Sequence, residues 1–358
     1  KNYIIHKIKS LYNWARMKYS IYINRNKRVN KIKEILKEKK ENYIIIAHPE
    51  NVEEIDTIKG LFKDNIINIR EQYTRKEASQ IARSIVESNK KIVVFDSFVE
   101  GWDMIMSEIK DINRKVKIKV LIHGGIGLLS DDIKWNAYNT VIDLYYKRNI
   151  DELGFFNKSL YEFNKRKGYN VQYLMKNIDI EDKEKYKKSQ EESNLIKIGL
   201  YKAYDNHMKN IFSQIVAVSL IENAKLECIP TNYKISMMGR KYNINLTGES
   251  RNLSKEELYE KMANNDVNLC LTTLDDDDNL PIESLELGTV CVTGKSYSYF
   301  KGTELEKYIA VNTNDDIIEI ENKIRDVLEN KEKILQLYNQ WKNSYVEEAN
   351  QKKNEFLK

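Results

Sequence analysis

The sequence predicts an α/β protein of two domains, each built on a parallel β-sheet covered by helices. Three observations lead to this prediction. Short runs of β-branched and aliphatic residues alternate with amphipathic helical patterns along most of the chain, as in successive strand–helix–strand units. The length of 358 residues exceeds that of one ordinary domain, which has roughly 100–200 residues. A highly charged stretch without glycine, residues 181–194, separates the two series.

These observations divide the chain into five parts. We expect a basic helical extension over residues 1–40, a first domain over 41–185, a linker over 186–194, a second domain over 195–330 and a final helix over 331–358. Runs of charged residues seldom enter a hydrophobic core, so the linker is expected at the surface.

The first forty residues carry thirteen Lys or Arg but only two acids, so the excess positive charge of this segment alone is larger than the net charge of +5 of the whole chain. Apolar side chains recur there at helical spacing and form one stripe. They are Ile4, Ile8, Leu11, Tyr12, Ala15, Tyr19 and Tyr22. A basic helix of this kind is typical of an anionic membrane surface, and residues 1–28 are expected to make that contact. A helix packed on the body of the protein, or on an upstream domain, explains the pattern equally well. No recognised motif points to nucleic acid.

The first domain is expected to be Rossmann-like, with six strands and intervening helices. The expected strands are Tyr43–Ala47, Ile66–Ile69, Ile92–Asp96, Ile118–Ile122, Val141–Tyr146 and Val171–Met175, and the clearest helices are Arg75–Asn89 and Leu160–Lys167. Glycines follow the fourth of these strands directly, in the run His123-Gly124-Gly125-Ile126-Gly127. Glycine lets a backbone approach a ligand closely. A strand end of this kind can lie against a ligand, but a histidine that merely caps the strand and bonds a nearby carbonyl fits the sequence as well.

A second, similar series follows the linker. Its expected strands are Leu195–Leu200, Leu226–Ile229, Ile244–Thr247, Val267–Leu274, Val290–Thr293 and Tyr308–Asn312, with helices over Asn206–Ile221 and Ser254–Asn264 and two more at the C-terminus. Asn279 and Pro281 suit the start of a short helix after the fourth of these strands, and Gly288 suits its end. A helix that begins at a strand's carboxyl end offers unpaired N–H groups, which favour phosphates.

The run Glu283-Ser284-Leu285-Glu286-Leu287-Gly288-Thr289 resembles the E-A-x-A-x-G-T motif of retaining nucleotide-sugar glycosyltransferases with the GT-B fold, family-four type. That family carries a second acid before seven intervening residues, a position held here by Asp275. The resemblance implies two Rossmann-like domains that face a central cleft. It also implies a last helix that crosses back to the first domain, for which Trp341 and Tyr345 are the expected anchors.

The resemblance also implies roles for single residues. Lys202 and Lys209, with the backbone amides of Leu280 and Ile282, would hold the donor diphosphate. Glu283 would bind the ribose, because a carboxylate accepts hydrogen bonds from neighbouring hydroxyls. Asp275 would bond the donor sugar, and His123 would face that sugar from the other domain.

The acidic loop departs from the family pattern. Asp276 and Asp278 stand where the family has glycine, Glu286 stands where it has a small residue, and Val290 replaces proline. Residues 275–278 can therefore be interpreted as part of the acidic pair, as a divalent-cation site or as a solvated loop. We favour the first interpretation and expect no cofactor and no metal.

The three cysteines, Cys228, Cys270 and Cys291, fall in or beside expected strands. Reduced core residues in a cytoplasmic protein are the simplest interpretation, with the inner face of the membrane as a second location suggested by the basic arm. No run reaches the roughly 20 apolar residues that span a bilayer.

The sequence thus predicts a retaining glycosyltransferase that moves a sugar from a nucleotide donor, with UDP-sugars favoured, to a cell-surface glycan, glycolipid or protein. A non-catalytic module of the same fold, acting as a partner or scaffold subunit, is one alternative. A UDP-sugar 2-epimerase of the same fold is another.

Overall fold

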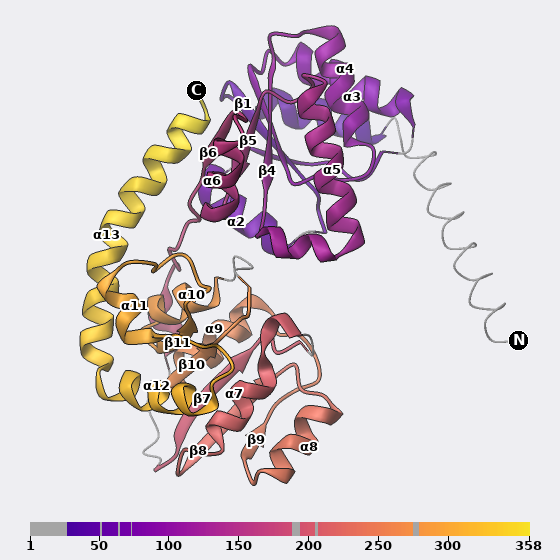
Figure 1. Ribbon diagram of the computed structural model, residues 1–358. Helices are drawn as coiled ribbons and strands as arrows, with labels where there is room; N and C mark the ends of the chain where they lie inside the picture. Colours follow the sequence, from indigo (N-terminus) through magenta and orange to yellow (C-terminus); the bar gives the residue numbers. More distant parts are fainter. Residues whose placement is uncertain are drawn as a thin grey trace, which may run out of the picture.

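The computed structural model describes residues 27–50, 52–63, 65–72, 74–187, 194–204, 207–274 and 279–358. The chain forms two α/β lobes, which lie one above the other in Figure 1. A long final helix, α13 (Lys331–Phe356), runs along one side of both. Each lobe contains its own six-stranded sheet, and every strand pairing is parallel.

The sheet of the first lobe has the order β2-β1-β3-β4-β5-β6. Its strands are β1 (Tyr43–Ala47), β2 (Ile66–Asn68), β3 (Ile92–Asp96), β4 (Lys117–Ile122), β5 (Glu152–Phe155) and β6 (Val171–Tyr173). Five lie where the sequence predicts a strand. The strand predicted over Val141–Tyr146 is wrong, because these residues end the helix α5 (Asp132–Tyr146). β5, which the sequence analysis missed, fills the place between β4 and β6.

Helices cover both faces of this sheet. One face packs on α3 (Arg75–Glu87), α4 (Trp102–Ile112), α5 and α6 (Lys158–Arg166). The other face packs on α2 (Val52–Phe62) and on the last turn of α13, which contributes Phe356. The strands are apolar on both sides because both sides are covered.

Residues 27–38 are helical and belong to the core of the first lobe. Val29, Ile32 and Leu36 are buried there, and Arg28 forms an ion pair of 2.7 Å with Glu77. This part of the basic extension therefore packs on the body of the protein. The apolar stripe of residues 1–26, and with it most of the predicted membrane contact, lies outside the described residues.

The sheet of the second lobe has the order β12-β11-β10-β7-β8-β9. Its strands are β7 (Ile196–Tyr201), β8 (Ala224–Ile229), β9 (Asn245–Thr247), β10 (Val267–Cys270), β11 (Val290–Gly294) and β12 (Ala310–Val311). The chain order runs outward in opposite directions from the β7–β10 pair. Loops that follow such a pair diverge, and ligands of open α/β sheets bind in the resulting crevice at the carboxyl ends of the strands.

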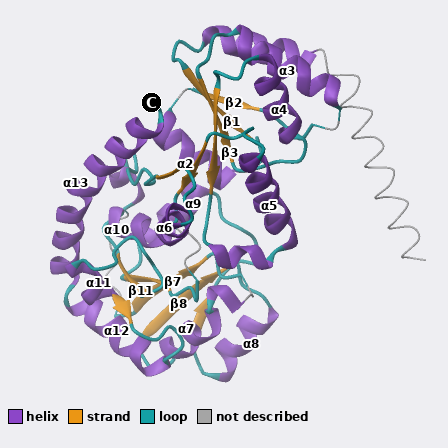
Figure 2. Ribbon diagram, turned by 45° about the horizontal axis from the view of Figure 1, so that its top comes forward, coloured by secondary structure: helices purple, strands orange, loops and turns teal. Residues whose placement is uncertain are grey.

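Helices again cover both faces of the sheet (Figure 2). α7 (Ile211–Val218) and α12 (Ile317–Glu329) pack together on one side. On the other side α9 (Lys255–Ala263) packs on α10 (Leu280–Glu286) and on the 3₁₀ turn η2 (Lys183–Tyr186). α8 (Tyr233–Lys241) and α11 (Glu304–Ile309) complete the lobe.

The chain passes between the lobes twice. Leu174 lies in the core of the first lobe, whereas Met175 and Ile178 lie in that of the second. The charged stretch predicted as a linker therefore begins beside the second lobe, where Tyr186 packs edge-to-face on Tyr259. Residues 188–193 lie outside the described part.

The second passage is α13. Trp341 and Tyr345, predicted to anchor this helix on the first lobe, instead pack on the second lobe, against Phe300 and Tyr299. The contact with the first lobe is made by Phe356, three turns farther along, where the helix has reached the first sheet.

Candidate functional site

The loop after β4 touches the loop after β10, so the carboxyl edges of the two sheets meet. Leu274 lies so close to Gly127 that a Cβ atom added at residue 127 would stand 2.6 Å from the Leu274 Cδ1 atom. Gly127 follows β4 by five residues, within η1 (Ile126–Ser130), and Leu274 follows β10 by four. The predicted site residues His123 and Glu283 belong to the segments after these two strands.

His123 stands just past the end of β4 and is paired with Asp96, the last residue of β3. Its Nε2 atom lies 2.7 Å from Asp96 Oδ1, and its ring stacks on Phe156 with 4.7 Å between centroids. Asp96 is 1% exposed, and its Oδ2 atom has no hydrogen-bond partner among the described residues. A buried carboxylate on one ring nitrogen fixes the orientation of the imidazole.

Glu283 lies in the first turn of α10, where the sequence predicts a helix. Asn279 occupies the N-cap position but makes no side-chain capping bond, Pro281 lies in the first turn, and Gly288 follows the helix with φ of 84°. The Glu283 side chain is half-buried, and its Oε1 accepts a hydrogen bond of 2.9 Å from the Tyr259 hydroxyl. The side chains of Leu280 and Ile282 are buried, so these residues could contact a ligand only through their backbone.

Tyr259, the partner of Glu283, is held in place by a well-capped helix. The N-cap Ser254 and Glu257 form a reciprocal capping box at the start of α9. The Tyr259 ring packs on Tyr186, and the Lys255 Nζ atom lies 5.7 Å above it. The site thus contains a phenol–carboxylate pair joined by a hydrogen bond, with the phenol ring fixed by its packing.

The two predicted lysines lie in the segment after β7. Lys202 is half-buried and has a positive φ of 52°, while Lys209 is half-buried in the 3₁₀ turn η3 (His207–Lys209). The Thr273 amide donates to the Met208 carbonyl at 2.8 Å, which holds this turn beside the end of β10. Lys209 is therefore close in space to the segment that leads to Asp275. Asp275 itself, with Asp276–Asp278, lies outside the described residues.

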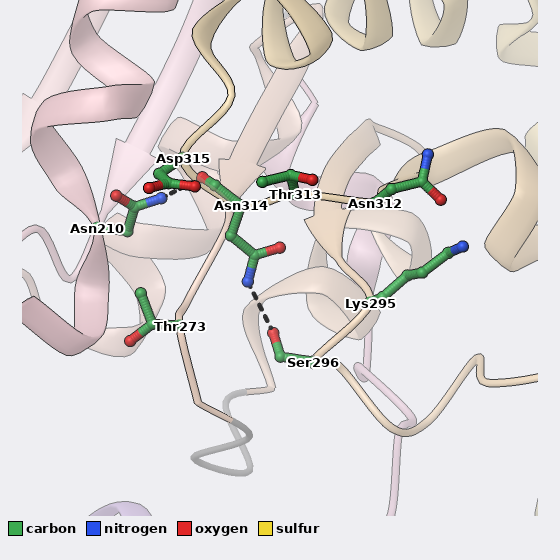
Figure 3. Close-up of a pocket in the computed structure, with 8 residues that line it drawn as sticks. All are labelled: Asn210, Thr273, Lys295, Ser296, Asn312, Thr313, Asn314 and Asp315. Carbon is green, nitrogen blue, oxygen red and sulfur yellow. Dashed lines mark hydrogen bonds between the residues drawn. The ribbon is translucent and has the colours of Figure 1, made fainter.

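A polar pocket of about 470 Å³ lies beside the loop after β10 and next to the segment that carries Lys209 (Figure 3). It is lined by Asn210, Thr273, Lys295, Ser296, Asn312, Thr313, Asn314 and Asp315. Asn314 donates to the Thr272 carbonyl at 2.7 Å and to the Ser296 hydroxyl at 3.2 Å. These bonds join the ends of β10, β11 and β12 and keep the carboxyl edge of the sheet in shape. The sequence analysis did not single out this pocket.

Two residues beside the site were missed from the sequence. Asp96 closes a fully apolar strand, and an acid at that point was a usable signal. Tyr259 offered none, because it precedes Glu283 by 24 residues and only the packing of α9 on α10 brings them together.

Within the part of the chain that the structure describes, no three His, Cys, Asp or Glu side chains gather as metal ligands would. The three cysteines are buried and form no disulfide with one another, as predicted. Burial raises the pKa of the Cys228 thiol to about 12, so it is not a reactive thiolate. Among the described helices, none is both long enough and apolar enough to cross a bilayer.

Comparison with known proteins finds the same architecture in solved structures only. No family model matches the sequence, and no curated protein matches it either. The trehalose-6-phosphate synthase of E. coli bound with UDP-2-fluoro glucose is 13% identical, with a TM-score of 0.59 over 84% of this chain and 81% of that one. A sucrose-phosphate synthase from Thermosynechococcus elongatus is 11% identical, with a TM-score of 0.54 over 78% of each chain.

The N-terminal domain of a trehalose-6-phosphate phosphatase from Candida albicans has the same fold. It is 11% identical, with a TM-score of 0.53 over 92% of both chains. The predicted GT-B architecture is therefore confirmed. At this level of identity the likeness concerns the fold alone, since one fold carries several activities.

Proposed function

We propose that the protein is a retaining glycosyltransferase that uses a nucleotide-sugar donor. One observation carries the proposal. Glu283 opens a helix at the carboxyl end of β10, where the loop that follows contacts the loop after β4 of the other lobe. A ligand on this helix would thus lie where the two lobes meet, with His123 on the opposite strand end.

In this proposal the departing diphosphate is stabilised by fixed positive charge. Lys202, Lys209 and the amides of Leu280 and Ile282 would hold it, since basic groups and a helix N-terminus stabilise negative charge that grows in the transition state. Glu283 would accept hydrogen bonds from the ribose hydroxyls, and Tyr259 would keep its carboxylate in place.

The donor sugar would lie between Asp275 and His123. Asp96 supports this role for His123, because a carboxylate that accepts from Nε2 orients the ring toward a substrate hydroxyl. No catalytic base is assigned, and the chemistry is attributed to positioning and electrostatics.

The donor class is inferred from the neighbouring structures. The E. coli synthase was solved with UDP-2-fluoro glucose, so a UDP-hexose is the first donor to test. The Burkholderia xenovorans enzyme, 11% identical with a TM-score of 0.55 over 84% of this chain and 82% of its own, was solved with glucose-6-phosphate. A sugar phosphate is therefore the first acceptor to test, ahead of the glycan, lipid or protein expected from the sequence.

The proposal is tested by donor binding. A thermal-shift panel of UDP-, GDP- and dTDP-sugars should reveal one donor that stabilises the protein by about 2.7 kcal/mol at 100 times its dissociation constant. Glu283→Ala should weaken that donor at least about tenfold, as expected when a hydrogen bond between a carboxylate and a hydroxyl is lost. Glu329→Ala, which removes an exposed carboxylate at the end of α12, is the control. Unchanged donor binding in Glu283→Ala would refute the site.

A non-catalytic module is the second candidate. It is favoured by the same fold in the N-terminal domain of a phosphatase and by the aspartates that fill the loop after β10. Calorimetry separates the two, since an inert module should give no heat with any nucleotide sugar.

A further inference from the structure

Glu286, at the C-terminal end of α10, holds a buried carboxylate that is bonded on both oxygens. Its side chain is 1% exposed. Lys183 and Lys342 donate to Oε1 at 3.0 and 2.8 Å, and the Tyr338 hydroxyl donates to Oε2 at 2.8 Å. A buried charge is costly unless it is paired and hydrogen-bonded, and here both conditions are met.

The three donors come from two other elements. Lys183 belongs to η2, the turn that follows the passage between the lobes, whereas Tyr338 and Lys342 belong to α13. The Tyr338 side chain is 1% exposed, and its burial, together with the adjacent carboxylate, raises its pKa well above the ordinary range. The hydroxyl therefore stays protonated and remains a donor to Glu286 at all physiological pH values.

The far end of α13 is attached to the first lobe in a comparable way. Lys119, in β4, is 2% exposed; it donates to the carbonyl of Phe356 and pairs with Glu152 at 2.7 Å. β4 leads directly to His123, and α10 carries Glu283. α13 thus connects β4, which precedes His123, to α10, which carries Glu283.

α10 depends on such contacts for its position. It has only seven residues, and isolated helices shorter than about 12 residues are unstable in water. Ser284 is bonded to Asn268 of β10 at 2.8 Å, and Glu286 provides the attachment to α13. Ser284 also donates to the carbonyl of Thr289, the residue before β11, at 2.8 Å. Hydrogen bonds thus hold α10 to the sheet, and the ion-paired Glu286 adds the link to α13.

We propose that Glu286 is a positioning residue, which fixes α10 to α13 and so sets where the Glu283 carboxylate stands relative to the first lobe. This inference rests on the proposed function for the role of Glu283 in donor binding. The attachment itself can be tested without any ligand.

The first experiment measures backbone hydrogen exchange over residues 280–288. Glu286→Gln keeps the shape of the side chain but removes the negative charge that pairs with Lys183 and Lys342. Exchange in α10 should accelerate about tenfold or more, because local opening becomes easier, while β8 stays unchanged. Asp179→Asn is the matched control, since it removes the other acid near Lys342, at 3.4 Å, without touching α10. Equal exchange in Glu286→Gln and the wild type would overturn the proposal.

The second experiment titrates UDP-glucose, or the donor found in the panel above, into the same proteins. Glu286→Gln should raise the dissociation constant about tenfold, and Asp179→Asn should leave it within about twofold. Faster exchange with unchanged donor affinity would reduce Glu286 to a structural role and overturn the proposal. A wild type that binds no nucleotide sugar would instead refute the proposed function, and the exchange experiment would still decide whether Glu286 holds α10.

Tyr338→Phe provides a milder variant should Glu286→Gln fail to fold. It removes one hydrogen bond to Oε2 and leaves both lysines in place. Exchange in α10 should then rise about threefold, as expected for one lost bond of modest net strength, and no change would overturn the proposal.

Discussion

At the level of single residues, the pairing of His123 with Asp96 fixes the orientation of the candidate site residue of the first lobe. Asp96 is enclosed, and one of its oxygens points at the imidazole. A charge-assisted hydrogen bond of this kind is roughly twice as strong as a neutral one. The histidine is therefore held in one orientation before any substrate arrives.

Replacing this carboxylate should affect transfer more than donor binding. In Asp96→Asn the bond to His123 becomes neutral, so kcat should fall about tenfold while the donor dissociation constant stays within about twofold. Steady-state kinetics with UDP-glucose, together with calorimetry, measure the two separately. Asp111→Asn, at an exposed end of α4, is the control. A loss of donor affinity equal to the loss of kcat would contradict the proposal that the second lobe binds the donor while His123 of the first lobe acts in transfer.

The sequence singles out His123 and Glu283, but it does not show that Asp96 and Tyr259 are the partners that hold them. His123 and Glu283 both follow strands that the sequence predicts from their apolar residues, and Glu283 also belongs to a recognisable motif. Their partners Asp96 and Tyr259 come from other strands and helices, and only the tertiary fold brings them near. Sequence patterns describe local structure, so contacts of this kind are invisible to them.

At the level of elements, the one wrong strand has a physical explanation. Val141–Tyr146 is a short apolar run, and such runs are compatible with a strand or with a buried helix. The real strand, Glu152–Phe155, starts with an acid and contains a glycine, both of which disfavour a strand. It forms because it pairs with β4 on one side and β6 on the other, which outweighs its local preference.

The capping box of α9 yields a prediction on stability against pH. A hydrogen bond from Arg251, followed by those from Ser254, lowers the pKa of Glu257 from 4.5 to about 2. A lowered pKa in the folded state contributes stability above pH 4.5, which is lost as the pH falls toward 2. Glu257→Gln should therefore lower Tm at pH 7, and the difference from wild type should shrink below pH 4.5.

Differential scanning calorimetry between pH 3.5 and 7 measures that difference. Glu256→Gln, the neighbouring exposed acid outside the capping box, controls for the loss of a charge from the first turn. A Tm difference that grows as the pH falls would contradict the assignment.

At the level of the whole molecule, Phe356 is the side chain that attaches the final helix to the apolar core of the first lobe. The ring is fully buried in a cluster with Ile45, Leu121 and Leu174. Phe356→Ala should cost about 3–5 kcal/mol of the free energy of unfolding of that lobe, as buried Phe→Ala changes do. Urea unfolding followed by fluorescence and circular dichroism measures this cost.

Glu347→Ala, an exposed position on the same helix, controls for helix propensity in the Phe356 experiment. Loss of Phe356 should also separate the unfolding of the two lobes into distinct transitions, because α13 no longer couples them. A single transition at the wild-type urea concentration would show that the attachment is not needed.

Two passages of the chain, one near Met175 and one along α13, join the two lobes. Two lobes that are connected at two separate points can rotate about the line through these points more easily than about any other axis. Such a swing would part Gly127 from Leu274 while leaving Phe356 and Glu286 in place. In the proposed transferase, opening between these two loops would admit substrates, and closing would exclude water.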